Sequence, residues 1–343
     1  MLTGIHVLLT YQCTGECDHC FLHCGPQREG TFTLHQLREL LREIKKIPTI
    51  DTVYFEGGEP FLFYAVLLAG LRMVRDAGLQ SGIVTNGYWA TSPEDAEQWL
   101  RPMLDLGIAD FSVSDDEFHS TKSDNSPGAI AYRAANKLGF PCAKICIEQP
   151  TCVPASDSGS DKGQPVTGGG VLFKGRAAEK LTAGLPVRPW RKLTTCPHEE
   201  LANPERVHVD AYGNVHVCQG VSVGNMWTTP LSELVRTYDA AKHPIVGLWS
   251  RVVLRASSSG SRWKWQTPTL TSAISVTWRE NRCCRRFRSF SRRRRYTDCE
   301  DLHAQNSFTV HARCWHRPPS PGSETDPTSS PTDGRGAVRS CRC

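Results

Sequence analysis

Strand-like and helix-like segments alternate over residues 5–147, and this alternation restricts the fold of the chain more than any other feature. Short apolar runs predict strands at residues 5–10, 52–55, 81–85, 108–114 and 142–147. Apolar residues at helical spacing predict helices between them, at residues 34–44, 61–76, 92 onward and 126–138. This repeat indicates parallel strands joined by right-handed crossovers, so we expect an α/β fold, either a barrel or an open sheet. In such folds functional side chains gather at the carboxyl ends of the strands.

The chain beyond residue 150 follows a different pattern. Residues 153–170 are rich in Gly, Ser and Asp and predict a loop. Two strands are expected at residues 206–209 and 214–218, joined as a hairpin by Tyr212-Gly213. A short helix is expected to open at residues 229–234.

Charge divides the chain into two unlike parts. Up to Ser250 there are 22 basic and 28 acidic residues, whereas the remainder holds 18 basic and 7 acidic residues. The acidic body gives no support for nucleic-acid binding. The basic part, residues 249–343, shows no strand or helix period and includes Arg292 to Arg295. We interpret it as a disordered or aberrant, frameshifted tail; the alternative is a disordered basic arm for nucleic acid.

Fifteen cysteines are compatible with a secreted disulfide scaffold or with metal ligation. The N-terminal residues lack the basic and apolar regions of a secretory signal, and the longest apolar run, residues 61–71, is too short to span a bilayer. We therefore expect a cytoplasmic protein without a membrane partner, in which clustered cysteines are metal or cluster ligands.

Cys13, Cys17 and Cys20 directly follow the first expected strand. Three thiolates on one tight loop can hold three irons of a cubane and leave the fourth iron open to a substrate or cofactor. The alternative is a zinc site, for which Cys24 offers a fourth ligand.

The Cys-x3-Cys-x2-Cys loop and the motif Gly57-Gly58-Glu59-Pro60, at the end of the second expected strand, resemble the radical SAM superfamily. The resemblance implies a partial (β/α)6 barrel over about residues 1–180 that holds a [4Fe–4S] cluster and S-adenosylmethionine (SAM). It implies that an electron from the cluster cleaves SAM to methionine and a 5′-deoxyadenosyl radical, which abstracts hydrogen from a substrate. It also assigns the Gly-Gly-Glu-Pro segment to the SAM amino group and His19 to the neighbourhood of the adenine.

Other strand ends carry further candidate SAM contacts by the same resemblance. Asn86 ends the third expected strand, where a simple turn is the alternative. Ser114 and Asp116 resemble the Ser-x-Asp element that binds the ribose hydroxyls. Arg176, in a Gly-Arg-Ala element, is a candidate for the SAM carboxylate, with an ordinary surface arginine as the alternative.

Residues 181–248 resemble the start of a SPASM or twitch extension, in which Cys196 and Cys218 are available for a second iron–sulfur cluster. The alternative is a small hairpin subdomain with buried cysteines. This resemblance implies a peptide or another small substrate, and the reaction requires an electron donor such as flavodoxin or ferredoxin. The rival function is a non-catalytic iron–sulfur or zinc-binding protein.

Overall fold

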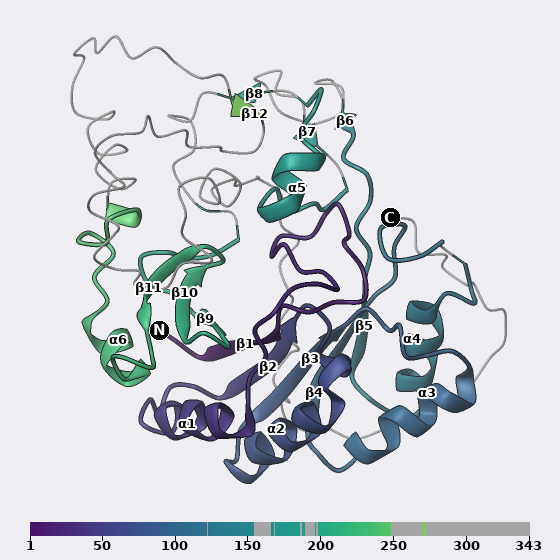
Figure 1. The fold of residues 1–343 in the computed structure, drawn as a ribbon, viewed down its shortest axis with the longest axis horizontal. Coiled ribbons are helices and arrows are strands. Elements are labelled where there is room, and N and C mark those ends of the chain that lie inside the picture. The colour runs from purple at the N-terminus through teal and green to yellow at the C-terminus, as the bar shows by residue number, and fades with distance from the viewer. Residues whose placement is uncertain are drawn as a thin grey trace, which may run out of the picture.

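The computed structural model describes residues 1–121, 123–153, 166–167, 169–185, 187–188, 196, 198–247 and 270–271. Its centre is a sheet of eight strands in the order β11-β10-β9-β1-β2-β3-β4-β5 (Figure 1). The first five strands in sequence are β1 (Gly4–Thr10), β2 (Thr52–Gly57), β3 (Gln80–Thr85), β4 (Ile108–Ser114) and β5 (Cys142–Ile145). Each pairs in parallel with the next, which confirms the parallel α/β arrangement expected from the sequence.

The C-terminal hairpin continues this sheet. Strands β9 (Arg206–Asp210) and β10 (Asn214–Cys218) are antiparallel to each other, and β11 (Val221–Asn225) follows β10 at the edge. Strand β9 pairs in parallel with β1, so β9 and β1 to β5 form a continuous run of six parallel strands. The sixth parallel strand thus joins beside β1, at the opposite edge from β5.

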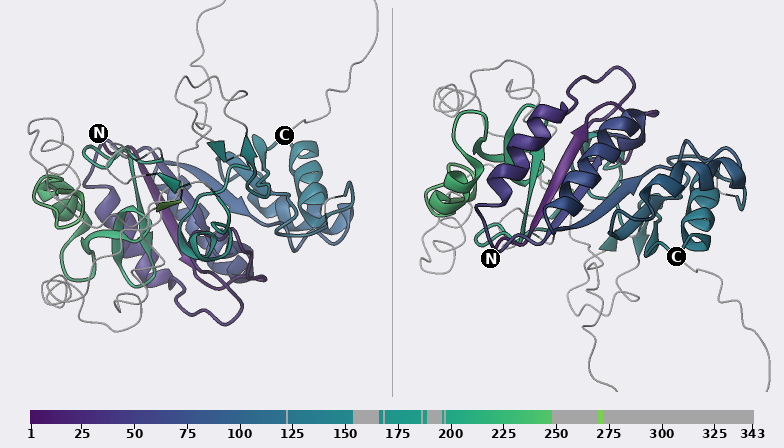
Figure 2. Two further views of the ribbon diagram at one scale, coloured as in Figure 1. Left: turned by 90° about the horizontal axis from the view of Figure 1, so that it is seen from above. Right: turned by 90° about the horizontal axis from the view of Figure 1, so that it is seen from below.

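Four helices cover one face of the sheet: α1 (Leu34–Ile44), α2 (Tyr64–Asp76), α3 (Pro93–Leu100) and α4 (Pro127–Lys137). Figure 2, seen from below, shows α1 and α2 lying across β1 and β2. The N-caps have direct sequence causes, because Thr33, Ser92 and Ser126 each accept a hydrogen bond from a backbone N–H of the first turn. The helix expected from residue 61 begins at Tyr64, because Pro60–Phe63 form a 3₁₀ turn capped by Glu59.

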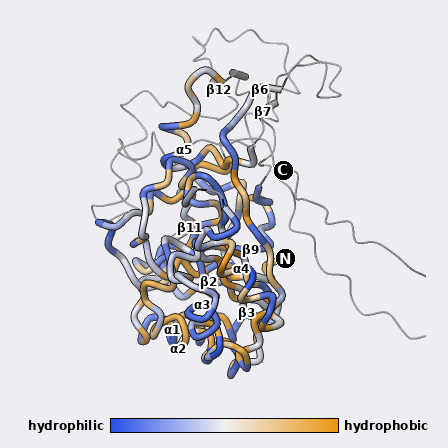
Figure 3. The backbone as a smooth tube through the Cα atoms, turned by 90° about the vertical axis from the view of Figure 1, so that its right-hand side faces the viewer, coloured by the Kyte–Doolittle hydropathy of each residue, from blue (hydrophilic) through white to orange (hydrophobic). Residues whose placement is uncertain are grey.

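The main core lies between the sheet and these helices. Alternate residues of β1, namely Ile5, Val7 and Leu9, join it, whereas Leu8 faces the other side of the sheet and packs with Tyr11 and Cys13. Hydrophobic positions, orange in Figure 3, lie among the strands and helices α1 to α4. The two faces of the sheet therefore differ: one is a hydrophobic core and the other carries the cysteine loop.

The remaining described elements are short. Helix α5 (Gly175–Lys180) lies on the cysteine-loop side of the sheet, and α6 (Leu231–Thr237) follows β11 (Figure 1). Two small sheets pair β6 (Cys152–Val153) with β7 (Val166–Thr167) and β8 (Val187–Arg188) with β12 (Leu270–Thr271). Strand β5 ends two residues earlier than expected, because the Ile147 N–H donates to the Asp116 carboxylate instead of to a neighbouring strand.

Within the described residues, no helix is long and apolar enough to cross a membrane. The interpretation of residues 249–343 as a disordered or frameshifted tail falls outside the described residues, apart from Leu270–Thr271. The division at residues 180 and 248 stays a prediction.

Candidate functional site

The cysteine loop leaves the carboxyl end of β1 and returns to it. The Cys13 N–H donates to the carbonyl of Gly25 at 3.1 Å, and the Gly25 N–H donates to the carbonyl of Tyr11 at 3.3 Å. Within the loop the Cys20 N–H donates to the carbonyl of Cys17 at 3.0 Å. These bonds close the loop on itself and hold its three cysteines in one short segment.

The thiols of this loop have unlike environments. Burial raises the pKa of Cys13 to about 11. A hydrogen bond from the Cys24 thiol, opposed by burial, lowers the pKa of Cys20 to about 6, and the same bond raises the pKa of Cys24 well above its usual value. The Cys24 N–H also lies 3.4 Å from the Cys20 sulfur. This environment favours the thiolate form of Cys20, the form that binds metal, and the Cys24 N–H lies against its sulfur.

Arg176 fastens the loop to helix α5. Its guanidinium donates to the carbonyl oxygens of Cys17 at 2.8 Å and Cys24 at 2.6 Å, and its backbone N–H donates to the carbonyl of Cys20 at 2.8 Å. The residue is 7% exposed, so the alternative of an ordinary surface arginine is wrong. Both terminal nitrogens of the guanidinium are directed to loop carbonyls.

Gly175 allows this contact. Its φ of +52° lies in the left-handed region, and a Cβ atom would come within 2.6 Å of the Phe21 carbonyl carbon and 2.9 Å of the Cys20 oxygen. Any other residue would push α5 away from the loop.

The Gly-Gly-Glu-Pro segment packs against the base of the cysteine loop. The Gly58 N–H donates to the Thr10 carbonyl at 2.7 Å, and the Glu59 N–H donates to the Gln12 carbonyl at 2.9 Å. A Cβ atom on Gly57 would meet the Thr10 oxygen at 2.5 Å, and one on Gly58 would overlap the Gln12 carbonyl. The glycines therefore permit a close approach to the chain's own backbone, immediately before Cys13.

Glu59 is fully buried and joins the ends of β2 and β3. Its Oε1 accepts hydrogen bonds from the Phe61 N–H at 3.0 Å and the Thr85 hydroxyl at 2.8 Å, and its Oε2 accepts from the Asn86 N–H at 2.7 Å. Burial raises the pKa of this carboxyl to about 7, although these hydrogen bonds oppose the rise. Glu59 is therefore a structural link within the site.

Asn86 extends this link to the cysteine loop. Its side-chain nitrogen donates to the Thr14 hydroxyl at 3.0 Å and lies 3.6 Å from the Cys13 sulfur. The side-chain oxygen accepts from the Tyr88 N–H at 3.0 Å. The turn at the end of β3 thus contacts the first cysteine of the loop.

The end of β4 brings Asp116 to the other side of the loop. Asp116 is 1% exposed; its Oδ1 lies 2.7 Å from His119 Nδ1 and accepts from the Phe118 N–H at 3.1 Å, and its Oδ2 accepts from the Ile147 N–H at 3.2 Å. Burial opposes ionisation, but His119 holds the pKa of Asp116 below its usual range. Ser114 is the last residue of β4, two positions before this carboxylate.

His19 meets the same segment from the cysteine loop. Its ring stacks on Phe118, with centroids 4.6 Å apart and planes at 22°, and lies edge-on to His119 at 4.9 Å. Burial and the nearby His119 lower the pKa of His19 to about 4. Although burial opposes it, hydrogen bonding with Asp116 and Cys17 raises the pKa of His119 to about 10. His119 therefore bridges the β4 end and the cysteine loop, a position the sequence did not distinguish from a solvated loop.

The donor set fits the cluster that the resemblance implies. Cys13, Cys17 and Cys20 are free cysteines on one loop, and the pKa of Cys20 is lowered toward the thiolate form. The buried Arg176 supplies positive charge beside them, which offsets the charge of bound thiolates. These three residues would hold the cluster.

Cys196 and Cys218 also come together. A hydrogen bond from the Cys218 thiol, aided by Lys174, lowers the pKa of Cys196 to about 6. The Lys174 ammonium, on a residue only 2% exposed, lies 3.0 Å from the Cys218 sulfur. The sequence did not single out Lys174 for this position.

Comparisons with known proteins give the same assignment. Residues 7–137 match the family model of the Radical SAM superfamily. The chain is 28% identical over 116 residues to the putative peptide biosynthesis protein YydG of Bacillus subtilis (strain 168), covering 34% of this chain and 36% of that protein. It is also 28% identical over 115 residues to the S-adenosylmethionine-dependent nucleotide dehydratase of Selenomonas ruminantium, covering 33% of this chain and 41% of that protein. The matched part thus spans less than half the length of either relative.

Among solved structures, BtrN in complex with AdoMet and 2-DOIA aligns with a TM-score of 0.46 and 16% identity, over 75% of this chain and 90% of that chain. The sequence matches, rather than this likeness, carry the assignment. The family match covers residues 7–137, which include the cysteine loop, the Gly-Gly-Glu-Pro segment and the ends of β3 and β4.

Proposed function

We propose that this protein is a radical SAM enzyme that binds a [4Fe–4S] cluster through Cys13, Cys17 and Cys20. When bound, the cluster and SAM supply a one-electron cleavage of a carbon–sulfur bond and, through it, hydrogen abstraction from a substrate. The observation that supports the proposal most is the direct hydrogen bonding of the Gly-Gly-Glu-Pro strand end to the base of the cysteine loop. Two motifs that are 37 residues or more apart in sequence therefore form one site.

The chain's own residues position this site. Glu59 and Asn86 tie the ends of β2 and β3 to the loop, and Arg176 ties the loop to α5. Leu8, Tyr11 and Leu22 pack around Cys13 and Cys24, so the inner side of the loop is shielded from water. Shielding of this kind protects a reactive intermediate from side reactions.

The SAM contacts that we propose lie around the loop. Gly57 to Pro60 would face the amino group of SAM, and His19 would face its adenine. Ser114 and Asp116 would contact the ribose. Asn86, which contacts the cysteine loop, is a further candidate contact. The stacking of His19 on Phe118 supports a site for a planar base. For Arg176 the loop carbonyls are the present partners, so a role toward the SAM carboxylate requires that one of these hydrogen bonds be shared or exchanged.

For the substrate we propose a peptide. The resemblance of residues 181–248 to a SPASM or twitch extension supports this class, as does the name of the relative YydG, a putative peptide biosynthesis protein. The electron would come from a small carrier such as flavodoxin or ferredoxin. A Cys196–Cys218 auxiliary cluster is part of the same proposal and predicts iron well above about four atoms per chain.

Anaerobic reconstitution with iron and sulfide, followed by dithionite and SAM, tests the proposal. We expect formation of 5′-deoxyadenosine and its loss in Cys17→Ala, with Cys142→Ala as a control because that free cysteine lies on β5, outside the loop. A reconstituted cluster that yields no 5′-deoxyadenosine would favour the rival, a non-catalytic iron–sulfur protein.

The zinc alternative is tested with Cys24→Ser. A four-cysteine zinc site needs Cys24 as its fourth ligand, whereas a three-cysteine cluster does not. Retained iron and retained 5′-deoxyadenosine in Cys24→Ser would exclude the zinc site. Loss of metal in this variant would support it.

A further inference from the structure

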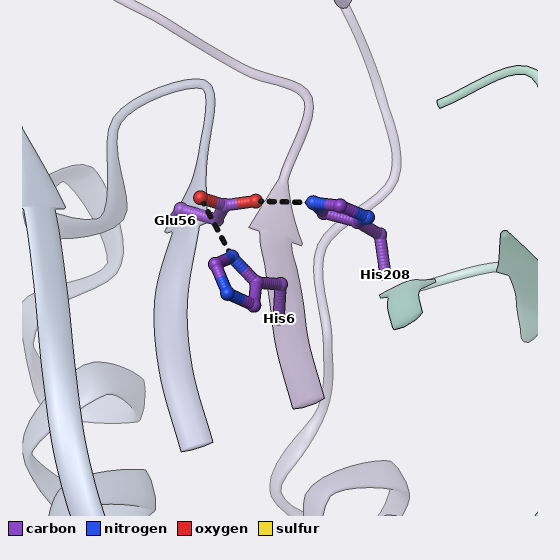
Figure 4. A group of neighbouring side chains, drawn as sticks. All are labelled: His6, Glu56 and His208. Atoms are coloured by element: carbon purple, nitrogen blue, oxygen red, sulfur yellow. Dashed lines mark ion pairs between the residues drawn. The ribbon is translucent and has the colours of Figure 1, made fainter. Parts of the chain in front are cut away.

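Three side chains converge on the cysteine-loop face of the sheet from three adjacent parallel strands. His6 on β1 is level with His208 on β9 and with Tyr54 on β2, and Glu56 is the next residue of β2 on the same face. Figure 4 shows the Glu56 carboxylate lying between the two imidazoles. Glu56 Oε2 is 3.2 Å from His6 Nδ1, and Glu56 Oε1 is 3.4 Å from His208 Nε2.

These atoms face one another without ordinary hydrogen bonds. Within the part of the chain that the structure describes, His6 Nδ1 and Glu56 Oε1 are buried and have no hydrogen-bond partner. A buried polar atom without a partner is costly, and a native structure normally supplies one. Two such atoms in one cluster therefore call for a shared partner.

The hydrogen bond with the neighbouring Gln219 determines the tautomer of the His208 imidazole. The Lys174 ammonium donates to Gln219 Oε1 at 3.3 Å, which orients the amide nitrogen toward His208 Nε2 at 2.8 Å. Because Gln219 donates this bond, His208 Nε2 presents a lone pair. His208 Nε2 therefore has no proton to donate to Glu56 Oε1 at 3.4 Å, and a cation between these two atoms removes their repulsion.

We propose that His6, Glu56 and His208 bind one divalent transition-metal ion, of the zinc or ferrous class. Bonds of about 2.0–2.1 Å in a tetrahedral arrangement place ligand atoms about 3.3–3.4 Å apart. The separations of 3.2 and 3.4 Å, each to a different oxygen of the Glu56 carboxylate, are of this size. With one ligand atom taken from each residue, the three atoms lie within 4.8 Å of one another. Two imidazoles and a carboxylate leave at least one coordination position for water or a substrate oxygen.

The proposed site is partly buried. The side chains of His6 and Glu56 are 12% and 13% exposed, and His208 beneath them is 2% exposed. Burial and the nearby His6, Arg206 and Lys174 lower the pKa of His208 well below its usual value. When the ion binds, His208 Nε2 bonds to it and Gln219, which is only partly buried, gives up its hydrogen bond.

The proposed ion is separate from the iron–sulfur cluster. None of its three ligands is a cysteine, and His6 precedes the loop by seven residues. On the loop-facing side of β1, Leu8 lies between His6 and the start of the loop. The proposal thus goes beyond the proposed function and holds whether or not SAM is cleaved.

The test uses the full chain after anaerobic cluster reconstitution, with Zn²⁺ as the probe. The protein is dialysed against buffered zinc, and zinc and iron per chain are measured in the same sample by mass spectrometry. We expect about one zinc per chain, and at least about tenfold weaker zinc binding in Glu56→Gln and His208→Gln at unchanged iron content. His35→Gln, which removes an exposed histidine on α1, is the matched control and should bind zinc as the wild type does.

Zinc-edge X-ray absorption of the wild-type protein gives a second readout that does not depend on the folding of any variant. The proposal requires nitrogen and oxygen neighbours at about 2.0–2.1 Å and no sulfur at about 2.3 Å. Sulfur neighbours would place the zinc on cysteines and overturn it. The proposal also fails if the wild type retains no zinc, or if Glu56→Gln and His208→Gln retain zinc like His35→Gln.

Discussion

The guanidinium of Arg176 donates a hydrogen bond from Nη1 to the backbone carbonyl oxygen of Cys17, over 2.8 Å. Nη2 of the same group donates to the carbonyl of Cys24. Since Cys17 and Cys24 lie on opposite arms of the cysteine loop, one buried side chain spans the loop. The arms are therefore held by a residue more than 150 positions away, at the start of α5.

Arg176→Ala should loosen the cysteine loop. It removes two charge-assisted hydrogen bonds and leaves two carbonyls without their partner, which costs about 2–4 kcal/mol. We expect a lower unfolding temperature and less iron retained per chain after gel filtration. Arg176→Lys should have an unfolding temperature and an iron content between those of the wild type and Arg176→Ala. One ammonium cannot reproduce the planar pair of donors of the guanidinium.

Arg72→Ala is the control for this experiment, because Arg72 is an exposed residue of α2. It should retain both the iron content and the unfolding temperature of the wild type. Wild-type values in Arg176→Ala would contradict the assignment of Arg176 to the loop.

Gly58→Ala should disrupt the contact between the Gly-Gly-Glu-Pro segment and the loop. The added methyl group would overlap the backbone carbonyl of Gln12, which cannot move without displacing the loop. Overpacking of this kind costs about 1–3 kcal/mol. Chemical denaturation measures the loss, with Gly4→Ala as the control, since its Cβ would lie 3.7 Å from the nearest atom, on Arg206. Equal stability of the two variants would refute the close approach.

Glu59 should give the protein a pH-dependent stability. Its folded-state pKa of about 7 lies above the usual 4.5, so folding favours the protonated carboxyl. The contribution of Glu59 to the free energy of unfolding is fully present below pH 4.5, the usual pKa, and is lost as the pH rises through 7. The loss between pH 5.5 and 8 is about 2 kcal/mol.

Denaturation of Glu59→Gln and of the wild type at both pH values measures this contribution. The substitution should remove that part of the slope, because glutamine does not ionise. Glu117→Gln, at an exposed position, should keep the wild-type slope. If Glu59→Gln keeps it as well, another group is responsible.

The sequence predicts the alternating part of the fold well, because its causes are local. Apolar periodicity sets β1 to β4, and Ser92 and Ser126 are helix caps that need no tertiary contact to be recognised. The parallel pairing of β9 with β1 could not be predicted, since it joins residues about 200 positions apart and no short pattern encodes it. The hairpin was correctly expected as a unit, but its attachment to the sheet depends on tertiary packing.

The candidate site likewise has a part that local sequence predicts and a part that depends on long-range contacts. The cysteine triplet and Gly57-Gly58 can be recognised as motifs because the residues of each motif lie close together in the sequence. By contrast, the contact of Lys174 with Cys218 depends on the placement of α5 against β10. His6, Glu56 and His208 left a faint signal: each is a polar residue at an alternate position of an otherwise apolar strand. Only the strand order β9-β1-β2 brings those positions together.

Glu43→Ala should weaken the attachment of α6 to α1. Glu43 Oε2 accepts hydrogen bonds from the Ser232 hydroxyl at 2.7 Å and from its N–H at 3.3 Å, so its removal costs about 1–2 kcal/mol. Burial opposes ionisation, but Lys46 and Ser232 lower the pKa of Glu43 below 4.5, so its contribution is present above that pH and is lost as the pH falls through the folded-state value. Equilibrium unfolding at pH 7 and pH 4 should therefore show that Glu43→Ala loses more free energy of unfolding at pH 7 than at pH 4.

Glu39→Ala, which removes a more exposed carboxylate of the same helix, is the control. Its free energy of unfolding should stay within about 0.5 kcal/mol of the wild type at both pH values. A deficit in Glu43→Ala no larger than that of Glu39→Ala would mean that α6 is held by its apolar contacts alone.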